Sequence, residues 1–177
     1  GLIEADEGDD IVDAGDGDDT VIGGDGSDSI DTGDGNDSVL ADDGGSPGFG
    51  NDTVTTGDGS DTVGTGLGDD VIDTSGSLPL IDNAPFPSIP TDANPDDDRD
   101  FVDADEGNDL ITTGDDADTI IAGEGNDTVF SGIDDDSVIG DGGDDLIVDP
   151  HGADFIDGGD GDDTIQAGVD AFTDYIG

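Results

Sequence analysis

The chain has 177 residues, 51 acidic side chains and one basic side chain, Arg99, so its formal net charge is −50. This charge excludes nucleic acid and anionic membrane surfaces as direct partners, because nothing in the chain neutralises phosphate. Only 29% of the residues are hydrophobic, and no apolar run approaches the ~18 residues of a membrane span, so direct membrane insertion is not expected.

From Ala5 onward the chain repeats a nine-residue unit, represented by Gly23–Asp31 with the sequence Gly-Gly-Asp-Gly-Ser-Asp-Ser-Ile-Asp. Positions one to six are turn-forming residues, and positions seven to nine predict a short strand. In chain order, units begin at Ala5, Ala14, Gly23 and Thr32, and after an insertion at 41–46 at Pro47, Thr56 and Thr65. After a second insertion, 74–94, eight units run from Pro95 to Gln166, and a last one from Ala167 is lengthened by two residues.

Position six of the unit is always aspartate, and valine or isoleucine always stands two residues later. These aspartates are Asp10, Asp19, Asp28, Asp37, Asp52, Asp61, Asp70, Asp100, Asp109, Asp118, Asp127, Asp136, Asp145, Asp154, Asp163 and Asp174. The pattern predicts a cation site at each aspartate and one core side chain in each strand.

Fixed-period repeats of this kind indicate a solenoid, in which each unit buries its apolar face against its neighbours. One unit is too short to close a turn, but two units give a strand, a turn, a strand on the opposite wall and a second turn. Residues 18 apart then stack at about 4.8 Å, as neighbouring strands do. We therefore expect an all-β parallel roll of about eight two-strand turns, with residues 1–73 and 95–177 in one continuous solenoid.

A chain with so little apolar surface and so much charge is expected to be disordered unless a ligand neutralises its carboxylates. Calcium suits this role because it takes six to eight oxygen ligands from carboxylates and carbonyls, whereas magnesium demands strict octahedral geometry. Zinc and copper prefer imidazole or thiolate, and the chain has one histidine, no cysteine and no methionine. The sequence predicts calcium.

At these residues the chain resembles the RTX (repeats-in-toxin) family, whose nonapeptide G-G-x-G-x-D-x-U-x forms a calcium-binding parallel β-helix. The resemblance implies a right-handed parallel β-roll in which the sixth-position aspartates and turn carbonyls bind Ca²⁺ between loops 18 residues apart. It also implies a bacterial protein exported by type I secretion, which folds in the calcium outside the cell. We therefore expect a secreted, extracellular or cell-surface location.

Alternate units place the aspartates in two columns, which we name the first edge and the second edge. The first edge carries Asp10, Asp28, Asp52, Asp70, Asp109, Asp127, Asp145 and Asp163; the second carries Asp19, Asp37, Asp61, Asp100, Asp118, Asp136, Asp154 and Asp174. Seven gaps on each edge allow at most about 14 inter-turn ions.

Position four is glycine throughout the first edge, whereas on the second edge it is glycine at Gly17, Gly35, Gly59 and Gly152 and aspartate at Asp98, Asp116, Asp134 and Asp170. Because aspartate adopts left-handed backbone less readily than glycine, we expect regular sites along the first edge and altered or weaker sites in the later half of the second. The alternative is that these aspartates add a carboxylate without changing occupancy.

No catalytic arrangement is expected, since His151 has no serine, cysteine or second histidine with which to form a nucleophilic pair. Arg99 is interpreted as a local counter-ion among neighbouring aspartates. The proline-rich, apolar insertion 74–94 is expected either to lie over outward residues such as Val71 or Phe101 or, less favoured, to dock a partner or another subunit.

Both ends read as parts of units, although solenoids need polar caps, so the chain is expected to be a fragment or a protomer that stacks end to end. The first functional hypothesis is a calcium-stiffened structural or assembly segment of a surface protein of the adhesin, S-layer or matrix type. The alternative is the calcium-folding region of a secreted hydrolase or toxin whose active domain lies outside these residues. Partners beyond calcium are then the chain itself or another cell-surface component.

Overall fold

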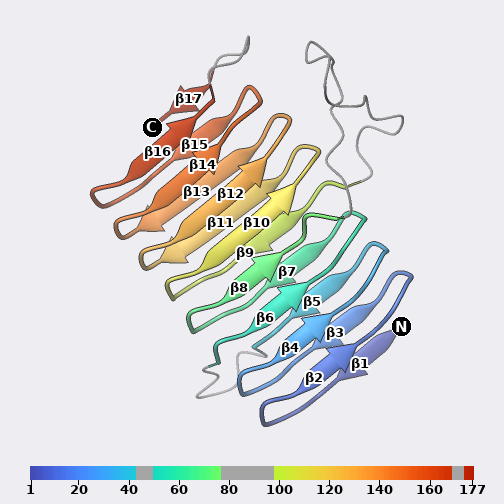
Figure 1. Cartoon of the computed structure of the whole chain (residues 1–177). Coiled ribbons are helices and arrows are strands. Elements are labelled where there is room, and N and C mark those ends of the chain that lie inside the picture. Colours follow the sequence, from blue (N-terminus) through green and yellow to red (C-terminus); the bar gives the residue numbers. More distant parts are fainter. Residues whose placement is uncertain (43–49, 77–97, 169–173) are drawn as a thin grey trace.

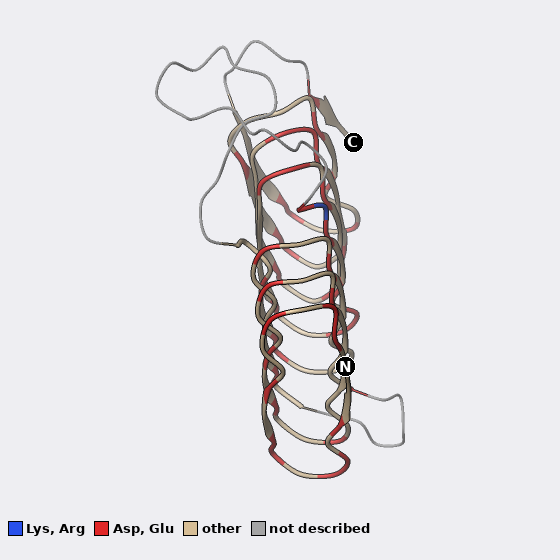
Figure 2. Ribbon diagram, turned by 90° about the vertical axis from the view of Figure 1, so that its right-hand side faces the viewer, with Lys and Arg blue, Asp and Glu red and all other residues tan. Residues whose placement is uncertain are grey.

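The computed structural model describes residues 1–42, 50–76, 98–168 and 174–177, which form a β-solenoid (Figure 1). The chain alternates between two parallel sheets that face each other, so each full turn contributes one strand to each sheet. Seen from the side, the turns stack into an elongated column (Figure 2). No helix occurs in these four ranges. The expected all-β parallel solenoid of about eight turns is confirmed.

The odd-numbered strands form a nine-stranded sheet, here named the odd sheet, and the even-numbered strands form an eight-stranded sheet, the even sheet. The odd sheet consists of β1 (Leu2–Glu4), β3 (Thr20–Ile22), β5 (Ser38–Leu40), β7 (Thr62–Gly64), β9 (Phe101–Asp103), β11 (Thr119–Glu124), β13 (Ser137–Gly142), β15 (Phe155–Asp157) and β17 (Tyr175–Ile176). The even sheet consists of β2 (Ile11–Asp13), β4 (Ser29–Asp31), β6 (Thr53–Thr55), β8 (Val71–Asp73), β10 (Leu110–Gly114), β12 (Thr128–Gly132), β14 (Leu146–Asp149) and β16 (Thr164–Ala167).

Strand register follows the repeat. Val12 pairs with Ile30 and Ile111 with Val129, so residues 18 apart stack. Val63 pairs with Val102 across the long insertion in the same register. Every pair keeps the same unit position, because a slip of one residue would turn the buried side chains to the solvent.

The core is one column of aliphatic side chains from each sheet. Successive side chains of a strand point to opposite faces, so the middle residue of each three-residue strand points inward while its neighbours point outward. Val21, Val54, Ile72, Ile120 and Ile156 are all 0% exposed. Of the sixteen Val and Ile residues that the repeat predicts as core, fourteen form the buried cluster between the sheets, whereas Ile165 is partly buried and Ile176 at the end of the described roll is 51% exposed.

The two insertions leave the roll within turns. The Ala41 and Asp42 N–H groups still donate to the carbonyls of Gly64 and Thr65, two residues beyond the expected start of the insertion, and the ladder resumes at Gly50. Residues 43–49 lie outside the described residues.

The long insertion begins in the same manner. The Thr74 N–H donates to the Thr112 carbonyl, and the described chain runs to Gly76 and resumes at Asp98. Residues 77–97, and with them any cover of Val71 or Phe101 by this segment, lie outside the described residues. Across the described ranges no helix has the length and apolar character needed to span a bilayer.

A two-turn period that the repeat analysis does not anticipate appears at position two along the first edge. Asp6, Asp42, Asp105 and Asp141 alternate with Gly24, Gly66, Gly123 and Gly159. A Cβ at Gly123 would overlap the Asp105 carbonyl oxygen, and one at Gly66 would lie 2.8 Å from the Asp42 Cβ. Close stacking of successive turns therefore leaves room for a side chain at this position only in every second turn.

The buried column predicts a sharp contrast between two isoleucines. Ile120→Ala removes a fully buried side chain, whereas Ile11→Ala removes one that is 87% exposed. Because a buried isoleucine loses both its transfer free energy and its packing, we expect Ile120→Ala to lower the free energy of unfolding by about 2–5 kcal/mol. Ile11→Ala should change it little. Urea unfolding in saturating calcium measures both, and equal losses would contradict the assignment of the core.

Candidate metal sites in the turns

The sixth-position aspartates lie where each turn enters a strand, in two columns along the edges of the roll. The turns from the odd to the even sheet form the first edge, and the turns from the even to the odd sheet form the second. Figure 2 shows acidic residues in the turns along the length of the column. Most of these carboxylates are buried: Asp52 and Asp127 are 1% exposed, and Asp61 and Asp118 are 2% exposed.

One carboxylate oxygen of each pair links successive turns. The backbone N–H of Asp127 donates to Oδ1 of Asp145 at 2.9 Å, and that of Asp118 donates to Oδ1 of Asp136 at 2.9 Å. The same bond joins the first edge from Asp10 to Asp163 and the second edge from Asp19 to Asp154. The aspartates thus hold the turns in register as well as lining them.

The other carboxylate oxygen is buried and meets no donor. This holds for Oδ2 of Asp10, Asp28, Asp37, Asp52, Asp61, Asp70, Asp109, Asp118, Asp127, Asp136, Asp145 and Asp154. Buried polar atoms are almost always satisfied in folded proteins, and a buried charge without a partner is costly. Such a row of oxygens is therefore suited to binding cations between successive turns.

Backbone carbonyls converge on the same places. A Cβ built at Gly140 would touch Asp145 Oδ2 and lie 2.5 Å from the carbonyl oxygen of Gly158 in the next turn. One built at Gly23 would touch Asp28 Oδ2 and lie 2.6 Å from the Ala41 carbonyl oxygen. Carboxylate and carbonyl oxygens are the hard donors that calcium prefers, so the donor set fits this ion.

Burial acts strongly on these carboxyl groups. It raises the pKa of Asp52 and of Asp109 to about 7, with neighbouring aspartates adding to the effect. On the second edge burial raises the pKa of Asp100 to about 9 and that of Asp136 to about 10. Without a cation, these groups would hold protons at neutral pH.

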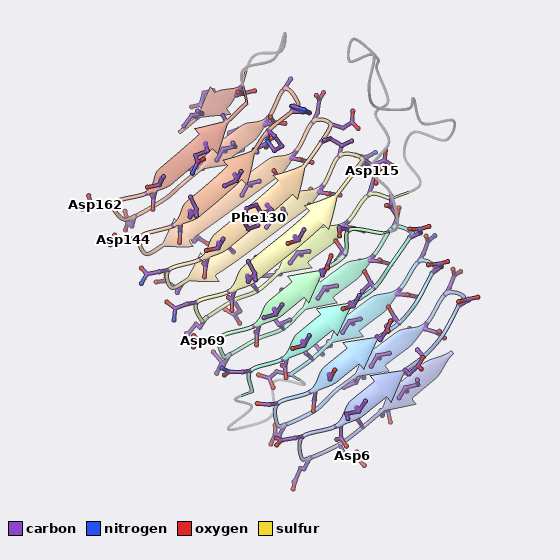
Figure 3. The ribbon with its side chains drawn as sticks, in the orientation of Figure 1. Asp6, Asp69, Asp115, Phe130, Asp144 and Asp162 are labelled. Atoms are coloured by element: carbon purple, nitrogen blue, oxygen red, sulfur yellow. The ribbon has the colours of Figure 1, made fainter. Side chains whose placement is uncertain are left out.

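Position five forms a second ladder, which the repeat analysis did not single out. Along the first edge its side chain accepts the N–H of the position-five residue one turn later: Asn108 Oδ1 from Asn126 at 2.9 Å, and Asp144 Oδ1 from Asp162 at 2.9 Å. Figure 3 places Asp69, Asp144 and Asp162 along one edge of the roll. The signal lay in the sequence, because aspartate, asparagine or serine occupies position five in every first-edge unit.

The second edge changes character in its later half. Position five becomes Arg99, Ala117 and Ala153 in three of its units. None of these three residues has the short polar side chain that accepts the bond elsewhere.

Position four changes in the same stretch. Asp116 and Asp134 have φ of 63° and 78°, whereas Gly35 and Gly59 have 149° and 133°. The Asp98 N–H donates to Asp116 Oδ2 at 2.9 Å, where first-edge turns use a backbone carbonyl such as that of Glu124. The second-edge turns with aspartate at position four thus differ from the other turns in backbone conformation and hydrogen bonding. Weaker ion binding in these turns stays a prediction.

His151 and Arg99 lie in second-edge turns. The His151 Nδ1 lies against the carbonyl oxygen of Pro150, and the Arg99 Nε–H donates to the Ala117 carbonyl at 3.4 Å. Arg99 therefore bridges to the next turn within the altered stretch.

The nine-residue repeat, the parallel roll and the aspartates along its two edges are also features of a known protein family. A sequence model described as RTX calcium-binding nonapeptide repeat (4 copies) matches residues 4–39, 48–73, 96–129, 112–147 and 152–171, together most of the chain. The chain belongs to the RTX calcium-binding repeat family. A search among curated proteins gave no match. RTX repeats bind calcium, and proteins that carry them are typically secreted by bacteria.

The raised pKa values predict how pH acts on the RTX roll without metal. Asp52, Asp100 and Asp136 hold their protons in the folded form up to about pH 7, 9 and 10, whereas the unfolded chain releases them near pH 4. The folded form then binds more protons, so its stability falls as pH rises through this window.

We expect metal-free protein to gain β structure as the pH is lowered from 8 towards 5, and calcium to reverse this dependence because it displaces the protons. Circular dichroism of metal-stripped protein measures the change, with sedimentation velocity to separate folding from association. Metal-free stability that rises with pH would contradict the burial of these carboxylates.

Proposed function

We propose that this chain is a calcium-folded structural or assembly segment of a secreted bacterial surface protein, of the adhesin, S-layer or matrix type. The row of buried Oδ2 atoms without donors supports the proposal, because it makes cation binding a condition of closing each turn. The sixteen position-six aspartates named above are the proposed side-chain ligands. Their Oδ2 atoms and the turn carbonyls would hold each ion between successive turns.

Ion binding and folding are one event in this proposal. The core supplies at most one valine or isoleucine per strand, and the unfolded chain carries a net charge of −50. About 14 inter-turn ions would carry 28 positive charges and leave −22 of the −50. The proposed element is thus stiff in calcium, expanded without it, and still highly acidic on its surface.

A stiff roll of this kind would hold the parts of the protein at its two ends a fixed distance apart. Parallel strands stacked at about 4.8 Å per turn give a roll of roughly 35–40 Å for eight turns. Outside the cell, such a segment would separate or align what lies on either side of it. We propose no catalytic role, because the paired carboxylates serve as metal ligands and turn acceptors.

The alternative function is the calcium-folding region of a type I-secreted hydrolase or toxin. Membership of the RTX family supports it, since these repeats occur generally in secreted proteins. The same calcium chemistry would then drive folding of an export region instead of building a rod. A catalytic domain in the flanking sequence of the full protein would favour the alternative, and further repeats or adhesion domains would favour the first proposal.

Calcium titration tests the coupling of binding to folding. We expect an expanded chain without β signal in chelator and a cooperative gain of β structure with calcium, because each ion completes two stacked turns at once. Circular dichroism with small-angle scattering records secondary structure and dimensions together. A metal-stripped protein at pH 7.5 that remains compact and resists protease would overturn the proposal.

A matched pair of variants tests the assignment of ligands. Asp127→Asn removes a buried carboxylate whose Oδ2 has no donor, and Glu124→Gln removes the same charge from an exposed side chain in the same turn. We expect Asp127→Asn to lower the cooperativity of the titration and to raise the calcium midpoint several-fold, because ligand charge sets affinity in calcium sites. Glu124→Gln should leave both nearly unchanged. Equal effects would show that overall repulsion, and not ligation, controls folding.

A further inference from the structure

One turn of the second edge carries a carboxylate where the five turns before it carry a neutral hydroxyl. Position one along this edge is Ala14, then Thr32, Thr56, Thr74, Thr113 and Ser131, then Asp149 and Ala167, with Thr74 holding this place in the ladder before the long insertion. The hydroxyls of Thr32, Thr56 and Thr113 lie against the carboxyls of Asp37, Asp61 and Asp118 in their own turns. The equivalent partner of Asp149 is Asp154, so here two carboxylates meet.

Asp149 is wholly buried, with a relative exposure of 0%. Neither of its oxygens meets a partner at hydrogen-bonding geometry, although the Ser131 hydroxyl of the preceding turn lies nearby. The position-six aspartate of a regular turn leaves one carboxylate oxygen, Oδ2, without a hydrogen bond, and Asp149 adds two more such oxygens to this turn. Proximity of two buried carboxylates without a counter-ion is strongly unfavourable.

A third carboxylate completes the group. Asp136 just before β13, Asp149 at the end of β14 and Asp154 just before β15 each offer an oxygen, and these atoms all lie within 4.8 Å of one another. Asp136 and Asp154 are also buried, at 3% and 2% exposure, and the Oδ2 of each lacks a donor. Among the described residues this is the one group of three acidic side chains with ligand atoms at metal-binding separation.

The backbone holds these side chains in place before an ion binds. Asp149 pairs with Ala167 in the parallel ladder of the even sheet, and Pro150 follows it, which restricts Asp149 to extended backbone. The Asp136 N–H donates to Asp154 Oδ1 at 3.1 Å. A site whose ligands are already positioned loses less entropy on binding.

We propose that Asp136, Asp149 and Asp154 form a distinct calcium site, stronger than the regular inter-turn sites and the first to fill. The inference rests on the proposed calcium-dependent folding and deepens it. Affinity in calcium sites rises with ligand charge and rigidity, and Asp149 places a full negative charge where the preceding turns have a neutral hydroxyl. Once this site is filled, the weaker turns bind calcium at higher concentrations.

This site stands out against its surroundings. It lies in the later half of the second edge, where Asp116 and Asp134 distort the turn and the sequence predicts weaker binding. The third carboxylate offsets that loss at one turn. The three carboxylates suit a hard, multiply charged cation, so terbium(III) should also bind at this site.

The test compares Asp149→Ser with Asp127→Asn in the full chain. Serine is the native occupant of the same position one turn earlier, at Ser131, so the first variant restores a regular turn. Calcium competition against a chromophoric chelator measures the tightest site, and circular dichroism follows folding. We expect Asp149→Ser to weaken the first binding step by about tenfold or more while the cooperative folding at higher calcium is kept. Asp127→Asn should lower cooperativity and leave the first step in place.

Terbium luminescence gives an independent readout. The chain has one tyrosine and no tryptophan, and Tyr175 donates its N–H to the Asp154 carbonyl and stacks on Phe155 at 5.2 Å between ring centroids. Emission excited through tyrosine therefore reports on ions near this end of the described roll. The first equivalent of terbium should produce emission in the native chain and in Asp127→Asn, and much less in Asp149→Ser.

The outcomes separate this inference from the proposed function. Calcium-dependent folding with the same first binding step in the native chain and in Asp149→Ser would overturn the three-carboxylate site and leave the calcium-folded segment standing. A native chain that neither binds calcium nor folds with it would overturn both. Loss of the first step in Asp149→Ser, with folding retained, supports both.

Discussion

Each turn of this molecule depends on a carboxylate whose two oxygens have different tasks. Oδ1 of the sixth-position aspartate accepts the N–H of its counterpart one turn earlier, as between Asp127 and Asp145, which fixes the spacing and the register of the strands. Oδ2 is buried beside turn carbonyls and meets no donor. The first contact makes the roll specific, and the second makes it conditional on a cation. A glutamate would carry the same charge, but its longer side chain would not place both oxygens in this way.

Much of the fold and of the proposed site followed from the nine-residue period alone. The pairing of Val12 with Ile30 and the two aspartate columns are geometric consequences of two units per turn, because stacking then relates residues 18 apart. The core was equally predictable, since strict valine or isoleucine at one position of a short strand leaves one inward side chain. Periodic sequences expose such information because each unit repeats the same constraints.

Other features could not be read from the period. The ladder between successive turns continues to Asp42 before the first insertion and to Thr74 before the second, because each backbone N–H there still finds a carbonyl in the next turn. The position-five ladder leaves a signal in the sequence, namely aspartate, asparagine or serine at that position, but its bonds depend on the direction in which side chains reach between turns. Asp149 is visible in the sequence, but its proposed role as a ligand depends on the burial of its carboxylate and on its closeness to Asp136 and Asp154. Position one of the repeat therefore has a different chemistry in this turn from the one it has in the other second-edge turns.

The departure of both insertions from within turns has a consequence for how such rods diversify. The first interruption falls on the first edge and the second on the second edge, and the strands on either side pair in unbroken register, as Val39 does with Val63 and Val63 with Val102. Extra chain of very different length is thus admitted without any adjustment in the sheets. A turn of either edge could therefore accept a foreign peptide. Peptides inserted in this way would be displayed on one side of the roll or the other, at a spacing set by whole turns. Evolution or protein design can then change the inserted segments while the solenoid stays the same.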